Sequence, residues 1–405
     1  MRLKERMDMG KCFNTEGVCI SDLHYMVDIN RQLNEIKNLV DNGKYLTINR
    51  ARQYGKTTTI RQLAQMLSPE YIVFSISFEG LDDYIYKNGS NFCQEFSGLL
   101  CDTIDYGETT GIPDEIHQIL SSYASGEQKS SFRVYSNVIS KMCKECTRPI
   151  VLIIDEVDQA SGNPIFLSFL GMLRNKYLKR TDRPTFQSVI LAGVHDIKNL
   201  KLKICSKGEH QYNSPWNIAA EFLVDMSFSP SCIAGMLRQY DNDHQTGMDI
   251  DEISGLLYDY TSGYPFLVSR LCKLMDEKIS KLEQFETKAS VWTKEGFLEA
   301  ERMILSEKNT LFESLINKLS DYPELNEILY NLLFSGKSAA FNPMNPAVDI
   351  AVMFGFVKNV DGMVVPANRI FDTLLYNYYL STGEIAVQGH SIPPRETRQR
   401  RTSRY

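Results

Sequence analysis

Two hydrophobic patterns alternate along the first half of the chain. Short runs of β-branched and aromatic residues have the length of strands, and stretches with apolar residues at helical spacing separate them. The strand-like runs are residues 45–48, 71–78, 150–154, 188–192 and 222–226. Residues 150–154 are apolar without interruption, so both faces of that strand must be covered. We therefore expect an α/β fold whose doubly wound parallel sheet has helices on both faces.

Helical spacing dominates the rest of the chain. A helix is expected over residues 29–40, and two more over 90–105 and 132–146 with a polar loop between them. Beyond Ser229 the predicted helices cover about 230–240, 249–261 and 265–282, and helical patterns resume from 295 to 334. Residues 355–358 and 363–365 flank an Asn-Val-Asp-Gly sequence, which predicts a β-hairpin. Helices followed by a hairpin indicate a winged-helix-like module at about 308–382.

These patterns divide the chain into five parts. They are an N-terminal leader and helix (1–44), an α/β core (45–228), a helical lid (229–290), a winged-helix-like domain (291–386) and a basic tail (387–405). The tail has five arginines and no hydrophobic pattern, so we expect it to be disordered.

The first predicted strand runs directly into a motif with a known chemistry. The sequence Gly55-Lys56-Thr57-Thr58 follows a short turn and begins a helical pattern. Strand, glycine turn, Lys-Thr and helix are the phosphate-binding loop of P-loop NTPases. Backbone N–H groups of the turn, which includes Arg52, Gln53 and Tyr54, would surround the phosphates. Lys56 would contact the β- and γ-phosphates of ATP, and Thr57 would bind Mg²⁺.

The match to this motif has one departure. The pattern G-x-x-x-x-G-K-[ST] places a glycine where this chain has Arg50. The assignment therefore depends on context, and the predicted strand 150–154 supplies it.

That strand ends in Asp155-Glu156, the acidic pair that complements a P-loop. At the carboxyl end of a parallel strand, Asp155 would lie beside the phosphate turn and hold Mg²⁺. Glu156, which we expect to continue the extended backbone, would orient or deprotonate the attacking water. Glu156 and the phosphate-binding Lys56 are the two catalytic residues that we predict. Asp158 fits either a helix start or a neighbour of the ligands.

At these residues the chain resembles the AAA-like P-loop ATPases of bacteria, close to their STAND-type and archaeal-type branches. The loop from Arg50 to Thr57 is similar to loops of that group in which arginine also replaces the first glycine. Thr261-Ser262-Gly263-Tyr264-Pro265 resembles the G-x-P motif of the lid. The resemblance, which extends over roughly residues 20–380, implies that Gly263 and Pro265 line the nucleotide pocket. It also implies that Arg270 lies where a sensor arginine reaches the γ-phosphate, although a solvated helix arginine explains it equally well.

Three further segments leave alternatives open. Residues 24–28 could line an adenine pocket, but we favour packing in the core. His195 and Asp196 follow a strand and are candidates for a sensor position. Residues 347–354, the candidate recognition helix, carry no lysine or arginine, so packing or oligomerisation is favoured over DNA reading. A basic loop (Lys198, Lys201, Lys203 and Lys207) and the tail are the best candidates for contact with nucleic acid.

Composition and charge limit the partners and the cellular compartment that we expect for this protein. The net charge of −6 argues against coating nucleic acid over the whole surface. Neither a secretory signal nor a membrane-spanning apolar run is apparent, so we expect a cytoplasmic protein with no membrane partner. Nine cysteines scattered along the chain fit reduced thiols.

The sequence therefore predicts an ATPase that hydrolyses Mg·ATP to drive a conformational switch, as a monomer or a homo-oligomer. Two alternatives stay open: a nucleotide-dependent interaction scaffold with little turnover, and a DNA-associated ATPase that works with partner proteins.

Overall fold

Five parallel strands form the central sheet, in the order β2-β3-β4-β1-β5. A computed structural model describes residues 10–49, 51, 53–160, 163–193, 220–221, 226–335 and 339–382. The strands are β1 (Leu46–Asn49), β2 (Ile72–Ser77), β3 (Ile150–Asp155), β4 (Ser188–Gly193) and β5 (Ala220–Glu221). Strand β4 lies between β1 and β3, so the phosphate-binding loop and the acidic pair follow strands that are not direct neighbours. Of the strand expected at 222–226, residues 222–225 lie outside the described part of the chain.

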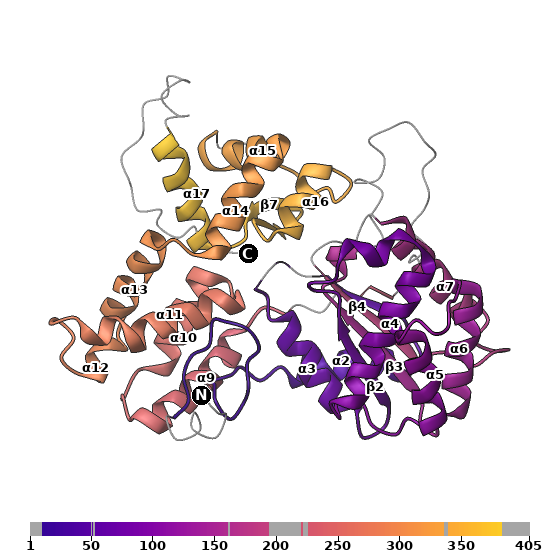
Figure 1. Cartoon of the computed structure of the whole chain (residues 1–405). Coiled ribbons are helices and arrows are strands. Elements are labelled where there is room, and N and C mark those ends of the chain that lie inside the picture. The colour runs from indigo at the N-terminus through magenta and orange to yellow at the C-terminus, as the bar shows by residue number, and fades with distance from the viewer. Residues whose placement is uncertain are drawn as a thin grey trace.

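Helices cover both faces of this sheet, as the continuous apolar strands predict (Figure 1). One face packs against α2 (Asn30–Asp41) and α3 (Lys56–Leu67). The other face packs against α4 (Gly89–Asp105), α5 (Asp114–Ala124), α6 (Phe132–Glu145) and α7 (Pro164–Leu178). Successive residues of β3 serve opposite faces: Ile153 belongs to the α2–α3 side and Ile154 to the other. The expected α/β class is confirmed.

One expectation about this layer was wrong. The polar loop predicted between the second and third helices contains α5. Its buried side chains Ile116, Leu120 and Tyr123 are spaced by three and four residues, as on one face of a helix. The surrounding serines and glycines concealed this short apolar stripe.

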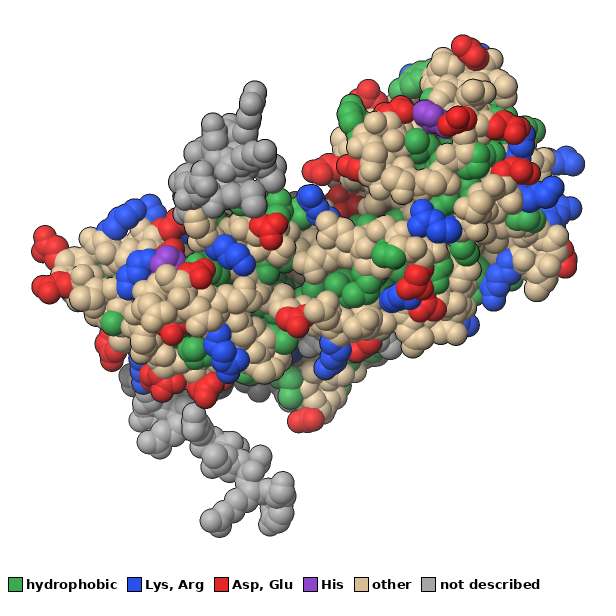
Figure 2. All heavy atoms as spheres, turned by 90° about the horizontal axis from the view of Figure 1, so that it is seen from below, with side chains coloured by type: hydrophobic (Ala, Val, Ile, Leu, Met, Phe, Trp, Pro, Cys, Tyr) green, Lys and Arg blue, Asp and Glu red, His purple; other side chains and the backbone are tan. Residues whose placement is uncertain are grey.

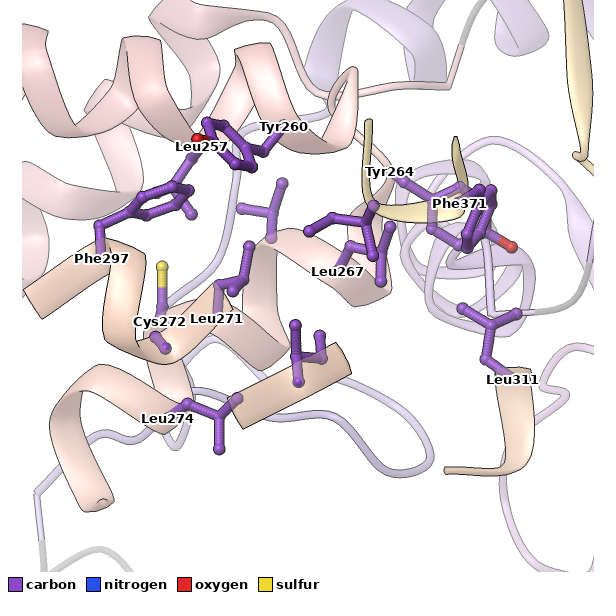
Figure 3. Close-up of a cluster of buried hydrophobic side chains, with 14 of the residues drawn as sticks. Leu257, Tyr260, Tyr264, Leu267, Leu271, Cys272, Leu274, Phe297, Leu311 and Phe371 are labelled. Atoms are coloured by element: carbon purple, nitrogen blue, oxygen red, sulfur yellow. The ribbon is translucent and has the colours of Figure 1, made fainter. Parts of the chain in front are cut away.

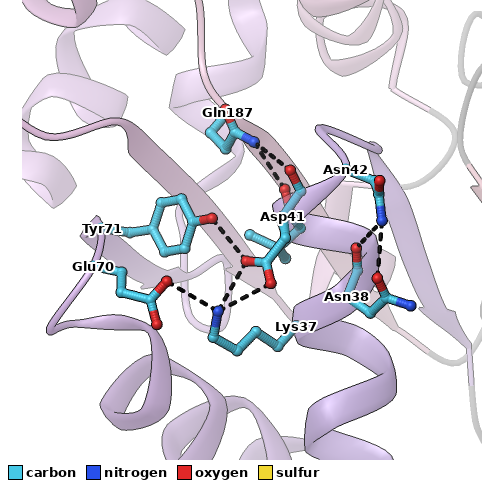
Figure 4. Close-up of polar contacts among 8 residues, drawn as sticks. Lys37, Asn38, Asp41, Asn42, Glu70, Tyr71 and Gln187 are labelled. Carbon is cyan, nitrogen blue, oxygen red and sulfur yellow. Dashed lines mark hydrogen bonds and ion pairs between the residues drawn. The ribbon is translucent and has the colours of Figure 1, made fainter.

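A cluster of polar contacts fixes the carboxyl end of α2 to the sheet (Figure 4). Asp41 accepts a hydrogen bond from the Tyr71 hydroxyl at 2.7 Å and pairs with Lys37 at 3.0 Å. Burial raises the pKa of Asp41, but the hydrogen bonds from Tyr71 and Lys37 outweigh it, so the pKa is lowered. Gln187 donates to the backbone carbonyl of Val40 at 3.0 Å. These contacts hold α2 beside the segments that lead into β2 and β4.

From residue 226 onward, the described residues form helices and one hairpin. This part begins with α9 (Pro230–His244), α10 (Ile250–Thr261), α11 (Pro265–Glu277), α12 (Lys288–Val291) and α13 (Lys294–Ser306). The C-terminal module, residues 308–382, contains α14 (Thr310–Asp321), α15 (Pro323–Phe334), α16 (Pro346–Met353), β6 (Val357–Val360), β7 (Met363–Pro366) and α17 (Arg369–Thr382). Strands β6 and β7 pair antiparallel as predicted, and Asp361 and Gly362 adopt positive φ at their turn. Within the described residues, no helix is long and apolar enough to cross a membrane.

The helices α9–α13 and the C-terminal module share one hydrophobic core. Figure 3 shows Leu271 of α11 near Phe297 of α13, and Tyr264 facing Phe371 of α17. The ring centroids of Tyr264 and Phe371 are 5.4 Å apart. The core is therefore continuous between these helices and the module.

The N-terminal leader runs along the outer side of α9 (Figure 1). The Tyr25 hydroxyl donates to Asp243 at 3.0 Å, and Gln239 donates to the Met26 carbonyl at 3.1 Å. At its other end the leader reaches α3, where the backbone N–H of Cys19 donates to Thr58 Oγ1 at 3.1 Å. The leader therefore bridges the P-loop helix and α9.

Candidate active site

The turn between β1 and α3 places helix N–H groups at the end of the sheet. Gln53 has φ of 57° and Gly55 has φ of 76°, both in the left-handed region. Gly55 is the N-cap residue of α3, so the first turn of the helix presents its unpaired N–H groups beside the loop. Arg50 and Arg52 lie outside the described residues. The left-handed positions at Gln53 and Gly55 show how the described part of the loop turns.

Three of the predicted residues meet at this edge of the sheet. The Thr57 hydroxyl donates to Asp155 Oδ2 at 2.9 Å, although Thr57 lies on α3 after β1, Asp155 ends β3, and β4 separates these two strands. Lys56 is 6% exposed, and its ammonium donates to the Ala51 carbonyl at 3.3 Å. Asp155 is also 6% exposed, and its Oδ1 accepts from the N–H of Glu156 at 2.9 Å. Tertiary structure thus brings a buried cation, a hydroxyl and a carboxylate together, which is the set that binds a metal–phosphate group.

Glu156 departs from the expected extended backbone. Its φ is 53°, a left-handed conformation that is costly for a residue with a side chain. Burial raises the pKa of Glu156, the positive charge of Lys56 opposes this, and the nearby Asp155, Asp158 and Glu79 raise it further. A carboxylate whose pKa is shifted toward neutrality is a better proton acceptor than an ordinary glutamate. A strained, partly desolvated residue next to a phosphate loop is typical of catalytic sites.

Asp158 lies in the short 3₁₀-helix η2 (Val157–Ala160), directly against the end of β4. A Cβ placed on Gly193 would come within 2.9 Å of the Asp158 carboxylate. The close approach explains why β4 ends in glycine. The predicted sensor candidates His195 and Asp196 lie outside the described residues.

A cavity of about 610 Å³ opens beside the phosphate loop. Several separate parts of the chain line it. They are the leader and the start of α2 (Asn14–Gly17, Cys19, Tyr25–Val27, Ile29, Gln32), the loop and α3 (Gln53–Gly55, Thr58, Thr59), the segment before α9 with one α9 residue (Met226, Phe228, Met236), α11 (Pro265, Phe266, Ser269, Arg270) and the residues at the start of α14 (Lys308–Thr310). Lys56, Thr57, Asp155 and Glu156 are not among its lining residues. The cavity is large enough for a nucleoside, with the phosphate loop at its edge.

The predicted lid residues divide into two groups. Pro265 and Arg270 line the cavity, and Gly263 does not. Its φ is 71°, and a Cβ there would collide with the Phe228 carbonyl oxygen. Gly263 is required for the close approach of two backbone segments, with its carbonyl accepting from Phe228 N–H at 2.8 Å.

Arg270 is held by a carboxylate. Its Nε and Nη2 donate to the two oxygens of Glu307 at 3.1 and 2.7 Å. The two side chains are 23% and 24% exposed. The fork binds α11 to the segment that leads into α14, so the alternative of a solvated surface arginine does not describe this residue.

Sequence reasoning missed much of the cavity wall. The leader residues Asn14–Gly17 and the residues Lys308–Thr310 at the start of α14 belong to no motif, and their spacing carries no signal. Two alternatives were open for residues 24–28, packing in the core or lining a pocket. Tyr25 and Val27 do both, because they are buried and also line the cavity. The only local indication was an aromatic residue upstream of the first strand.

Lys358, the lysine of the predicted hairpin, makes a hydrogen bond within the molecule. Lys358 donates to the Ser262 hydroxyl at 2.8 Å, which joins the hairpin to the end of α10. On the face shown in Figure 2, basic and acidic side chains are interspersed over the described surface. Neither observation favours a nucleic-acid interface on this hairpin or this face. The basic loop at 198–207 and the arginine tail lie outside the described residues.

Comparison with known proteins agrees with this geometry. The sequence matches a family model described as an AAA-like domain over residues 20–380. Its fold is similar to that of the Walker-type ATPase PABY2304 of Pyrococcus abyssi, with a TM-score of 0.57 at 12% identity, covering 90% of this chain and 99% of that chain. The ORC2 protein of Aeropyrum pernix in its ADP form gives a TM-score of 0.43 at 10% identity, covering 91% and 97%. No curated protein matches the sequence.

Proposed function

This chain belongs to the AAA-like domain family and is a P-loop ATPase, and we propose that its nucleotide cycle drives a conformational change in the C-terminal module. ATP binding and hydrolysis follow from the family. The assignment of roles to residues and the coupling to the module are our proposals.

In the proposed site, Lys56 binds the β- and γ-phosphates together with the N–H groups of the 53–57 turn. Thr57 and Asp155 hold Mg²⁺; their side-chain oxygens, 2.9 Å apart, are the hard donors that this ion prefers. When bound, Mg²⁺ neutralises charge on the phosphates. Glu156 accepts a proton from the attacking water. The adjoining cavity, with Pro265 on its wall, takes the nucleoside.

One observation carries the proposed coupling: the phosphate loop contacts the C-terminal module directly. Gln53 donates to the Thr310 hydroxyl at 3.2 Å. Tyr54 packs edge-on against Tyr264 with centroids 4.6 Å apart, and Tyr264 packs in turn against Phe371. A Cβ on Gly355 would come within 3.3 Å of the Ala51 side chain. Any change in the loop on nucleotide binding must therefore be accommodated by the module.

These contacts also suggest where the moving parts divide. The predicted boundary at 290/291 falls within α12, and α13 packs against α11. We place the boundary of the moving module at residues 307–309 instead.

The test combines turnover with a conformational readout. Steady-state ATP hydrolysis with Mg²⁺ should be lost in Glu156→Gln, while ATP binding is retained. Hydrogen exchange of residues 306–312 should then differ between the ATP-bound Glu156→Gln protein and its ADP-bound form. Identical exchange in the two forms would contradict the switch and support a scaffold role. Adding DNA to the turnover assay separates the DNA-associated alternative, because stimulation that salt removes would favour it.

A further inference from the structure

The cavity beside the phosphate loop receives three helix N-termini. Gly55 caps α3, Pro265 is the first residue of α11, and Asn309 caps α14, and all three line the cavity. Each helix N-terminus carries unpaired N–H groups and about half a positive charge. A polyanionic ligand is favoured where three such ends converge, and only the first belongs to the phosphate loop.

Lys308 adds a full positive charge at the third of these ends. It lines the cavity and makes no ion pair with any described residue. The residue before it, Glu307, accepts hydrogen bonds from Arg270, and the residue two positions later, Thr310, accepts one from Gln53. The backbone at Lys308 therefore lies between two residues that are held by hydrogen bonds, one to α11 and one to the phosphate loop.

Two buried polar atoms at the same place have no hydrogen-bond partner among the described residues. They are Asn309 Nδ2, a donor, and Gln53 Oε1, an acceptor. Both residues line the cavity. Buried polar groups in proteins are nearly always paired, so the Asn309 donor points to a ligand with acceptor oxygens at this end of the cavity. The Gln53 acceptor needs a donor group and does not itself contact a phosphate. The other end of the Asn309 side chain is already used, because its Oδ1 accepts from Phe312 N–H at 2.9 Å.

We propose that Lys308 and Asn309 bind the phosphates of the nucleotide, so that the C-terminal module supplies part of the nucleotide site within the same chain. This inference rests on the proposed function and extends it. The Lys308 ammonium and Asn309 Nδ2 donate to phosphate oxygens from the side opposite Lys56. Bound nucleotide then joins the module to the phosphate loop, and loss of nucleotide frees it.

The experiment is a titration of the full chain with Mg·ADP and Mg·ATP by calorimetry. Lys308→Ala should weaken both affinities about tenfold, as expected for loss of one charge-assisted hydrogen bond. Lys308→Arg should restore most of the affinity. The matched control is Lys294→Ala, an exposed lysine at the start of α13, which should bind like wild type. Thermal unfolding of each variant checks that the fold is intact.

A second variant separates the ligand role from helix capping. Asn309→Asp keeps the oxygen that caps α14 and replaces the Nδ2 donor with a negatively charged acceptor. It should weaken nucleotide binding without lowering the melting temperature. If Lys308→Ala and Asn309→Asp both bind like Lys294→Ala while Lys56→Ala does not bind, this inference is overturned and the proposed function stands. If wild type binds neither nucleotide, both fail.

Discussion

The two sides of the cavity are built in different ways. The phosphate side uses residues that follow two strands of one sheet, and its key contact joins Thr57 to Asp155. The opposite side is assembled from the leader, α11 and the start of α14, and the leader lies more than two hundred residues before the other two. The parallel sheet places the first set automatically, because the carboxyl ends of its strands share an edge. The second set depends on how the helical half packs. In the proposed cycle, chemistry depends on the residues positioned by the sheet, and recognition and coupling depend on the helical half.

The largest effect should follow from removing the phosphate-side cation. Lys56→Ala is expected to weaken ATP binding by about 100-fold or more, since a buried charge that pairs with phosphates has no substitute there. Calorimetry measures the affinity, with Lys294→Ala as the control. Unchanged affinity would show that the phosphates bind elsewhere in the cavity.

Removing the proposed base should separate binding from turnover. Glu156→Gln keeps the size of the side chain but cannot accept a proton, so kcat should fall by about 10²–10⁴-fold with little change in ATP affinity. Single-turnover hydrolysis with excess enzyme measures this. A fall of less than about tenfold would assign the base to another residue.

The stability of the protein should be sensitive to one added methyl group at Gly263, where the segment before α9 crosses the segment before α11. Gly263→Ala must shift the Phe228 backbone and hold alanine at φ of 71°, so we expect a loss of about 2–4 kcal/mol in the free energy of unfolding. Denaturant unfolding measures it. Gly255→Ala, within α10 and with no atom near its added Cβ, is the matched control and should be neutral or slightly stabilising. Similar values for both variants would show that Phe228 is not fixed there.

Variants of the Arg270–Glu307 ion pair test whether Glu307 competes with the nucleotide phosphates for the Arg270 guanidinium. Glu307→Gln releases the guanidinium for the phosphates and should tighten ATP binding roughly two- to fivefold, a range set by the modest strength of partly exposed pairs. Arg270→Ala should weaken it by a similar factor. The double variant, measured in the same titration, shows whether the two effects depend on each other. Weaker binding in Glu307→Gln would mean that the fork positions Arg270 for the ligand instead.

The smallest expected effect concerns pH. Because the pKa of Glu156 is raised above its ordinary value of 4.5, the protonated form persists at higher pH than in a solvated glutamate. Protonated Glu156 cannot accept a proton, so kcat/KM should fall as pH is lowered, with a midpoint above 4.5. Asp158 contributes to the raised pKa, so Asp158→Asn should move the midpoint toward lower pH. A midpoint that does not move would remove Asp158 from the electrostatics of the site.

Most of the sheet could be predicted from sequence, because its physical cause is local. Uninterrupted apolar runs such as Ile150–Ile154 need cover on both faces, and strand–turn–helix patterns impose parallel connections. Helix α5 was missed because its three buried side chains stand among serines and polar residues. Glu156 was wrongly expected in an extended backbone. Its φ angle depends on the packing of η2 against β4, which no short window of sequence reports.

By itself, the sequence determined the fold class, the phosphate loop and the acidic pair, since each is written in consecutive residues. The tertiary structure alone decided that Gly263 serves a backbone crossing, that Arg270 is paired with Glu307, and that Lys308 and Asn309 reach the cavity. The physical reason is distance along the chain. A cavity wall formed by several distant segments depends on how those segments pack together, and that packing places residues whose own neighbours in sequence give no sign of their role.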